Sequence, residues 1–203
     1  METKSAERVY HLSVVYGGHN IGQAETSLAF ASEKGYLETV IFLVTRRRVD
    51  IHTNNGEALL CASVNGHLDV VKFLISSGTD IHSCDDEALR WASMFGRLEV
   101  VKFLMGCGAD VHARDDEALR WTSNNGFLEV AKYLVESGAD IHAGDDDSLG
   151  RASLFGHLEV VQFLILNGAN IHARNDYALR WASKAWSPLR SGLKLLILNR
   201  AGQ

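Results

Sequence analysis

The sequence is poor in residues that interrupt or cross-link a chain. Its 203 residues include one proline, Pro188, and three cysteines without a C-x-x-C pair. An odd number of unpaired cysteines does not make a disulfide framework and suits a reducing compartment. The stretch "METKSAERVY" is charged rather than apolar, so it is no secretory signal, and no apolar run reaches transmembrane length. We therefore expect an intracellular, cytoplasmic protein.

Positive charge is scarce as well. The chain has 20 Lys and Arg against 25 Asp and Glu, a net charge of -5. Proteins that bind phosphate backbones or anionic lipids carry a basic surface. We therefore expect neither nucleic acid nor a membrane as a partner. With 46% apolar and 22% charged residues, the chain has the balance of a folded globular protein.

What the sequence does contain is a repeat. The pair Ile/Val-His recurs every 30 residues, at positions 51–52, 81–82, 111–112, 141–142 and 171–172. A fixed period of this length predicts an array in which each unit packs against the next. We expect about six repeats over residues 24–203, the last a degenerate C-terminal cap. Residues 1–23 form an N-terminal cap or an unassigned segment.

Each block of the period predicts two short helices. In the block of residues 81–110, Asp85 or Asp86 is suited to cap the first helix, and Gly96 to end it in the left-handed conformation. The stretch "LEVVKFL" supplies the second helix. The apolar arc of the first helix consists of Ala88, Leu89, Trp91, Ala92 and Phe95, and Arg90 and Met94 lie opposite it.

The segments "GRLEVVKFLMGCGADVHARD" and "GHLEVVQFLILNGANIHARN" resemble the second half of the ankyrin repeat. That family has a period of about 33 residues and opens with T-P-L-H, where this chain has Glu87-Ala88-Leu89-Arg90. The resemblance implies an all-α, helix-turn-helix solenoid with shortened loops in place of β-hairpin fingers. It also implies a concave face that binds partner proteins. The 30-residue variant resembles ankyrin-repeat proteins of giant DNA viruses, for which the cytoplasm would be that of the host.

Binding residues are expected where the repeats disagree, because stacking demands the same surface from every repeat. The two positions before the turn glycine vary from Glu33-Lys34 to Asn124-Asn125, and Trp and Arg nearby are common at binding hot spots. Packing at the edge of the core is the alternative interpretation of the tryptophans and Met94, and Phe95 is expected to be buried. The predicted partner-binding residues are Arg90, Trp91, Met94, Phe95, Arg120, Trp121, Asn124, Asn125, Leu154 and Phe155.

The repeated histidines suggest a metal site, but stacked helices lie about 8 to 10 Å apart, whereas zinc needs each ligand at about 2 Å. The acidic runs lack the ligand spacing of a calcium loop. We expect them to cap helices and to pair with the arginine of the same helix, Arg90 or Arg120. In the fifth repeat Gly150 replaces this arginine, and we expect Asp147 to pair with Arg151. No catalytic or phosphate-binding motif is present. We expect no enzyme, metal or cofactor.

These patterns favour a non-catalytic, monomeric scaffold that binds a partner protein on its concave face. The alternative is an adaptor that recruits a bound protein to the host ubiquitin-ligase machinery. Residues 193–203 are too short for the docking segment that such an adaptor needs, so residues 1–23 would have to supply it.

Overall fold

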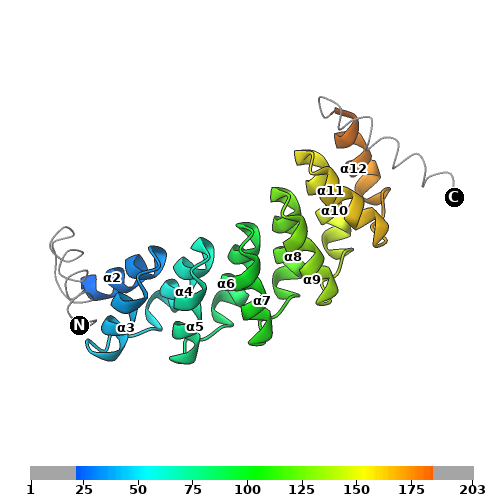
Figure 1. Cartoon of the computed structure of the whole chain (residues 1–203). Helices are drawn as coiled ribbons and strands as arrows, with labels where there is room; N and C mark the ends of the chain where they lie inside the picture. Colours follow the sequence, from blue (N-terminus) through cyan, green and yellow to red (C-terminus); the bar gives the residue numbers. More distant parts are fainter. Residues whose placement is uncertain (1–21, 185–203) are drawn as a thin grey trace. The chain divides into compact units, whose positions relative to one another are not determined.

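The computed structural model describes residues 22–184, and all regular secondary structure within them is helical (Figure 1). The predicted all-α architecture with short loops is therefore confirmed. The expected terminal segments, residues 1–21 and 185–203 with Pro188, lie outside the described residues. The first helices of successive repeats are α2 (Gly22–Glu33), α4 (Thr53–Asn65), α6 (Ser83–Met94), α8 (Ala113–Asn125), α10 (Ala143–Phe155) and α12 (Ala173–Lys184). The second helices are α3 (Leu37–Thr45), α5 (Leu68–Ser76), α7 (Leu98–Gly106), α9 (Leu128–Glu136) and α11 (Leu158–Leu166).

The helices belong to two units. The described part of the first unit comprises residues 22–92 and 99–109, and that of the second comprises residues 93–98 and 110–184. In the first unit α2 packs against α4, and α3 against α5. In the second unit α10 packs between α8 and α12, and α9 packs against α11. Within each unit, first helices thus stack on first helices of the next repeat, and second helices on second helices.

Both helices of a repeat supply deeply buried side chains, and Leu119 of α8 is 0% exposed. In α9, Val130 is 2% exposed, and Ala131 and Leu134 are 0% exposed. This spacing places all three on one arc of the helix. A nine-residue helix is marginal on its own in water, so packing against α8 and α11 holds α9 in place.

The turn between the two helices of a repeat is closed by a glycine. Gly96 and Gly126 have φ of 68° and 78°, the left-handed conformation that the sequence predicts. Each glycine also lies under a side chain of the next repeat: a Cβ at Gly96 would come 2.5 Å from the ring of Phe127, and one at Gly126 would meet His157. Both the backbone conformation and the contact with the next repeat therefore require glycine.

The first helices begin in a way that the sequence analysis did not predict. In α8, Arg114, Asp115 and Asp116 have φ of 53°, 59° and 53°, so three successive residues are left-handed before the right-handed helix starts. Left-handed residues with a side chain cost about 1 to 2 kcal/mol each, least for Asn and Asp. We call this segment the left-handed turn. It recurs at 54–56, 84–86, 144–146 and 174–176.

Candidate functional site

In the third, fourth and fifth repeats, the last residue of the left-handed turn is a buried aspartate. Asp116 is 4% exposed, and its carboxylate lies 3.1 Å from Nδ1 of His112 and accepts a 2.9 Å hydrogen bond from the backbone N–H of Asp140. Asp146 is likewise 3.1 Å from Nδ1 of His142 and accepts from the backbone N–H of the following repeat at 2.7 Å. The expectation that these aspartates cap helices is corrected here: they join one repeat to the next.

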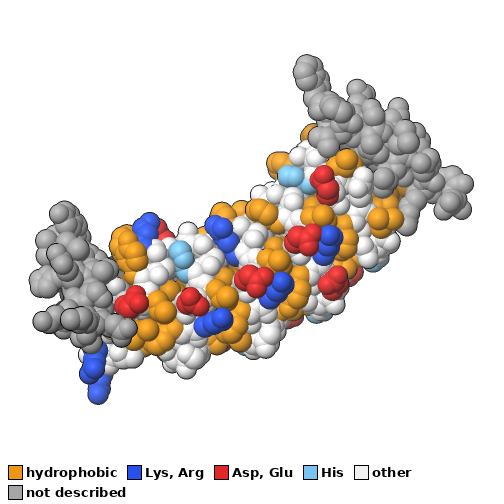
Figure 2. All heavy atoms as spheres, viewed as in Figure 1, with side chains coloured by type: hydrophobic (Ala, Val, Ile, Leu, Met, Phe, Trp, Pro, Cys, Tyr) orange, Lys and Arg blue, Asp and Glu red, His pale blue; other side chains and the backbone are white. Residues whose placement is uncertain are grey.

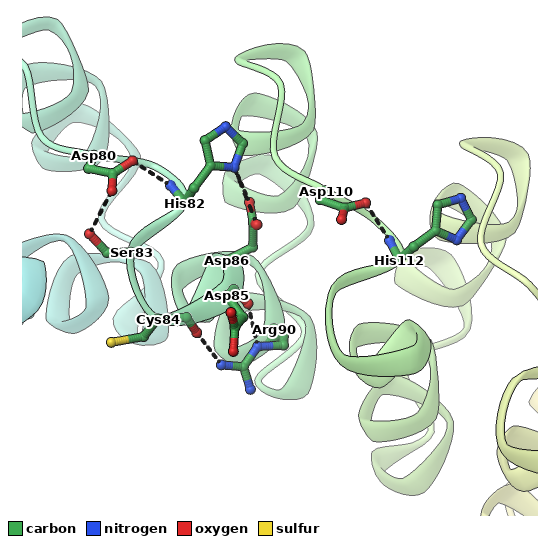
Figure 3. Close-up of polar contacts among 9 residues, drawn as sticks. All are labelled: Asp80, His82, Ser83, Cys84, Asp85, Asp86, Arg90, Asp110 and His112. Carbon is green, nitrogen blue, oxygen red and sulfur yellow. Dashed lines mark hydrogen bonds and ion pairs between the residues drawn. The ribbon is translucent and has the colours of Figure 1, made fainter.

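Four of the five repeated histidines, His82, His112, His142 and His172, pair with the aspartate at this position. Nδ1 of His82 lies 3.1 Å from Asp86, while the imidazole remains 57% exposed (Figure 3). The backbone N–H of His82 donates to Asp80, and the same contact recurs between His112 and Asp110 (Figure 3). Each histidine therefore helps to fix the loop that enters the left-handed turn. Within residues 22–184, no group of three His, Cys, Asp or Glu side chains is placed to hold a metal ion.

Arg90, expected on the partner-binding surface, is only 2% exposed. Its Nε donates to the carbonyl of Asp85 at 2.9 Å and its Nη2 to that of Cys84 at 2.8 Å (Figure 3). Arg120 makes the same contact with the carbonyl of Arg114 at 2.8 Å. Arg90 therefore positions the left-handed turn instead of facing a partner. A helical wheel could not show this, because it contains no information on the segment that precedes the helix.

The predicted burial of Phe95 is also corrected. Phe95 is 38% exposed, and Phe155, at the same position of the fifth repeat, is 55% exposed. α6 ends at Met94, so Phe95 lies in the turn between the two helices and not on the helical arc that buries Ala92. Trp91 and Trp121 are half-buried, and Nε1 of Trp91 donates to Glu87 at 3.1 Å.

The remaining candidates, Met94, Asn124, Asn125 and Leu154, are half-buried in the second unit. The side-chain amide of Asn125 donates to the carbonyl of Met94 in the preceding repeat at 3.2 Å. The carbonyl of Asn124 lies 2.9 Å from Nε2 of His157 in the next repeat. These contacts use the carbonyl groups of Met94 and Asn124 and the side chain of Asn125, so they do not depend on the side chain of Met94.

The charged positions of the fifth repeat include an ion pair that the sequence predicts. Nε of Arg151 donates to Oδ2 of Asp147 at 2.5 Å. Two further arginines lie at the same carboxylate, Arg174 at 2.5 Å and Arg120 at 3.6 Å. The sequence analysis missed this cluster, because it depends on contacts between three repeats. On the face that Figure 2 displays, acidic and basic side chains of the described residues lie beside one another among hydrophobic ones.

The cysteines offer little chemistry. Burial raises the pKa of the Cys61 thiol, with a smaller contribution from Glu57, so this thiol is disfavoured as a nucleophile. Cys84 and Cys107 are exposed thiols, and none of the three forms a disulfide.

Comparison with protein families assigns the repeat. A model of ankyrin repeats (3 copies) matches residues 86–175, and a second model, ankyrin repeats (many copies), matches residues 59–105. The comparison with curated proteins found no match. Every helix within residues 22–184 is too short or too polar to cross a membrane. Helix pairs stacked at a 30-residue period and family matches across residues 59–175 agree, and the chain belongs to the ankyrin-repeat family.

Proposed function

We propose that the chain is a non-catalytic, monomeric scaffold that binds a partner protein through its first-helix surface. This surface comprises the half-buried and exposed side chains of the first helices and of the two residues before each turn glycine. Ankyrin repeats form protein–protein interaction domains and in general carry no catalytic activity. By the family resemblance, the first-helix surface corresponds to the concave, partner-binding face.

The observation that carries the proposal is side-chain variation on a constant backbone. Asn124 and Leu154 occupy equivalent positions and are both half-buried, although one is polar and the other apolar. The residues just before them, Ser123 and Ser153, are identical and no more than 1% exposed. Stacking therefore explains the serines but not their neighbours, which are free to differ for binding.

Exposed aromatic side chains support the same surface. Phe95 and Phe155, both in the second unit, keep 38% and 55% of their surface in contact with water. Large aromatic side chains that become buried on association provide much of the binding energy at protein interfaces. The half-buried Trp121 adds a third such side chain to this unit.

A triple substitution tests the proposal. Met94, Asn124 and Leu154 would each be replaced by glutamate, which adds charge and a desolvation penalty to the surface without removing a buried side chain. We expect the variant to keep the melting temperature of the parent and to lose its partners. Partners would first be identified by affinity capture and mass spectrometry, and binding of each purified partner would then be measured by calorimetry.

The control places glutamates on the second helices, at Lys102, Lys132 and Gln162, which changes the net charge even more, and this variant should retain the partner. Binding that survives the first triple substitution on a folded protein would refute the first-helix surface. Recovery of a ubiquitin-ligase component among the partners would favour the adaptor function. The segments that an adaptor would use to dock lie outside the described residues.

A further inference from the structure

The fifth repeat differs from the fourth at several positions of its first helix, and three of these differences lie close together in the structure. Where α8 has Glu117, Arg120 and Trp121, α10 has Asp147, Gly150 and Arg151. At the position of Glu117 and Asp147, the sixth repeat has Tyr177. All these residues belong to the second unit, so their mutual contacts are defined within it.

With these substitutions, three arginines lie at the carboxylate of Asp147. The side chain of Asp147 is 9% exposed. Its Oδ2 accepts from Nε of Arg151 at 2.5 Å, and its Oδ1 accepts from Nη1 of Arg174 at 2.5 Å. Nη1 of Arg120 lies 3.6 Å from Oδ2. The three cations come from three successive repeats, so no single repeat could form this cluster.

Gly150 leaves space for the side chain of Tyr177 from the sixth repeat. A Cβ at this position would lie 2.8 Å from Cδ1 of Tyr177, so an arginine like those of the neighbouring repeats would displace the tyrosine ring. The guanidinium of Arg174 lies 5.4 Å from the centre of that ring, a cation–π contact. Tyr177 in turn packs edge-on against Trp181, with 6.0 Å between ring centres. The glycine is thus part of the same arrangement as the arginines.

The cluster holds more positive charge than its buried carboxylate can neutralise. One arginine would suffice to pair Asp147, but three surround it. The side chains of Arg151 and Arg174 are 35% and 45% exposed. The terminal amino groups of Arg151 make no hydrogen bond within the described residues. Even when the nearby carboxylate of Asp115, 3.5 Å from a Cβ built at Gly144, is included, the cations outnumber the anions.

We propose that Arg151 and Arg174, held in place by Asp147 and supported by Arg120, bind the carboxylate of an acidic side chain on the partner protein. This proposal rests on the proposed function, because the partner protein supplies the carboxylate. A guanidinium presents a planar set of donors that matches a carboxylate, and Asp147 already fixes the orientation of both groups. Such preorganisation lowers the entropy lost on binding. Tyr177 and Trp181 provide adjoining aromatic surface.

The test uses the whole chain without its partner. The Nε–Hε signals of the arginines would be followed by NMR while sodium acetate or a hexaglutamate peptide replaces chloride at constant ionic strength. We expect saturable shifts at Arg120, Arg151 and Arg174 and none at the exposed Arg46. Replacement of Arg174 by glutamine should weaken the affinity for hexaglutamate about two- to fivefold. Lys132→Gln, which removes one positive charge elsewhere, should leave it unchanged.

The variant Arg174→Gln leaves Asp147 with two arginines, so it should fold, and its melting curve verifies this. Arg151→Gln provides the second variant and should weaken binding to a similar extent. Absence of saturable shifts with acetate and hexaglutamate would overturn the proposal. Saturation by inorganic phosphate alone would also overturn it, in favour of a phosphorylated partner. Because no partner is present, these results are independent of whether the first-helix surface binds one.

Discussion

The fourth and fifth repeats have nearly the same backbone and different surfaces. The left-handed turn begins with φ of 53° at Arg114 and 61° at Gly144, and both first helices end at a glycine with φ of 78°. The side chains that these helices present are nevertheless unlike, since α8 carries a tryptophan where α10 carries Arg151.

The comparison separates two kinds of sequence constraint. Asp116 and Asp146, which accept hydrogen bonds from the backbone of the next repeat, are identical in the two repeats and buried. Positions that face away from the stack are free to carry an apolar, a polar or a charged side chain. A repeat array can therefore acquire a new surface charge without altering its backbone.

The largest expected effect comes from the shared core. Leu134 and Leu164 are both 0% exposed, so replacing either with alanine leaves a cavity and should lower the free energy of unfolding by about 2 to 5 kcal/mol. Leu104 should behave in the same way. The half-buried Leu154, replaced by alanine, should change it by less than about 1 kcal/mol. Urea denaturation measures the free energy of unfolding of each variant. Equal losses of stability at Leu154 and Leu164 would contradict the separation of core from surface.

A smaller effect is expected at the buried aspartates. Asp116→Ala and Asp146→Ala each remove a carboxylate that accepts from the backbone of the next repeat, which should cost about 1.5 to 3 kcal/mol. Asp176 makes the same pair with a histidine, but its side chain is 52% exposed. Asp176→Ala should therefore cost less than about 0.5 kcal/mol in the same urea experiment. Three equal values would show that the contact between repeats contributes nothing.

The smallest effect concerns the turn glycine. Gly126→Ala strains a left-handed residue and pushes on His157, and should cost about 1 kcal/mol or more. Gly138 also has a positive φ, 103°, but a Cβ there would meet nothing within 4 Å. Gly138→Ala therefore measures backbone strain alone. If the contact with His157 matters, adding His157→Ala should reduce the cost of Gly126→Ala and leave the cost of Gly138→Ala unchanged.

Much of the fold follows from periodicity and local chemistry. The 30-residue period, the helix pairs and the left-handed Gly96 were predictable, because each depends on residues close together in the sequence. The left-handed turns were not predicted, since three such residues in a row are unfavourable without outside support. Runs of Asn, Asp and Gly, as at residues 54–56 and 144–146, were the available signal.

The candidate site was less predictable than the fold. Helical periodicity placed Arg90 on the surface, yet its guanidinium is buried against the carbonyls of Cys84 and Asp85. The cluster around Asp147 depends on the distance between side chains of different repeats, which one sequence does not contain. Variation between repeats identified Met94 and Leu154 as free to differ, and their role in binding stays a prediction.

The hydrogen bond from the backbone of one repeat to the aspartate of the previous repeat has a consequence for how such a chain can grow. The donor is a main-chain N–H, and both Asp140 and Asn170 supply it. Because the contact does not depend on the donor's side chain, a 30-residue block can be duplicated, deleted or exchanged without loss of this junction. An insertion of one residue would move the N–H away from the carboxylate. The junction thus favours insertion or deletion of whole 30-residue blocks over insertion of single residues. The array can lengthen by tandem duplication while each new copy diverges on the first-helix surface.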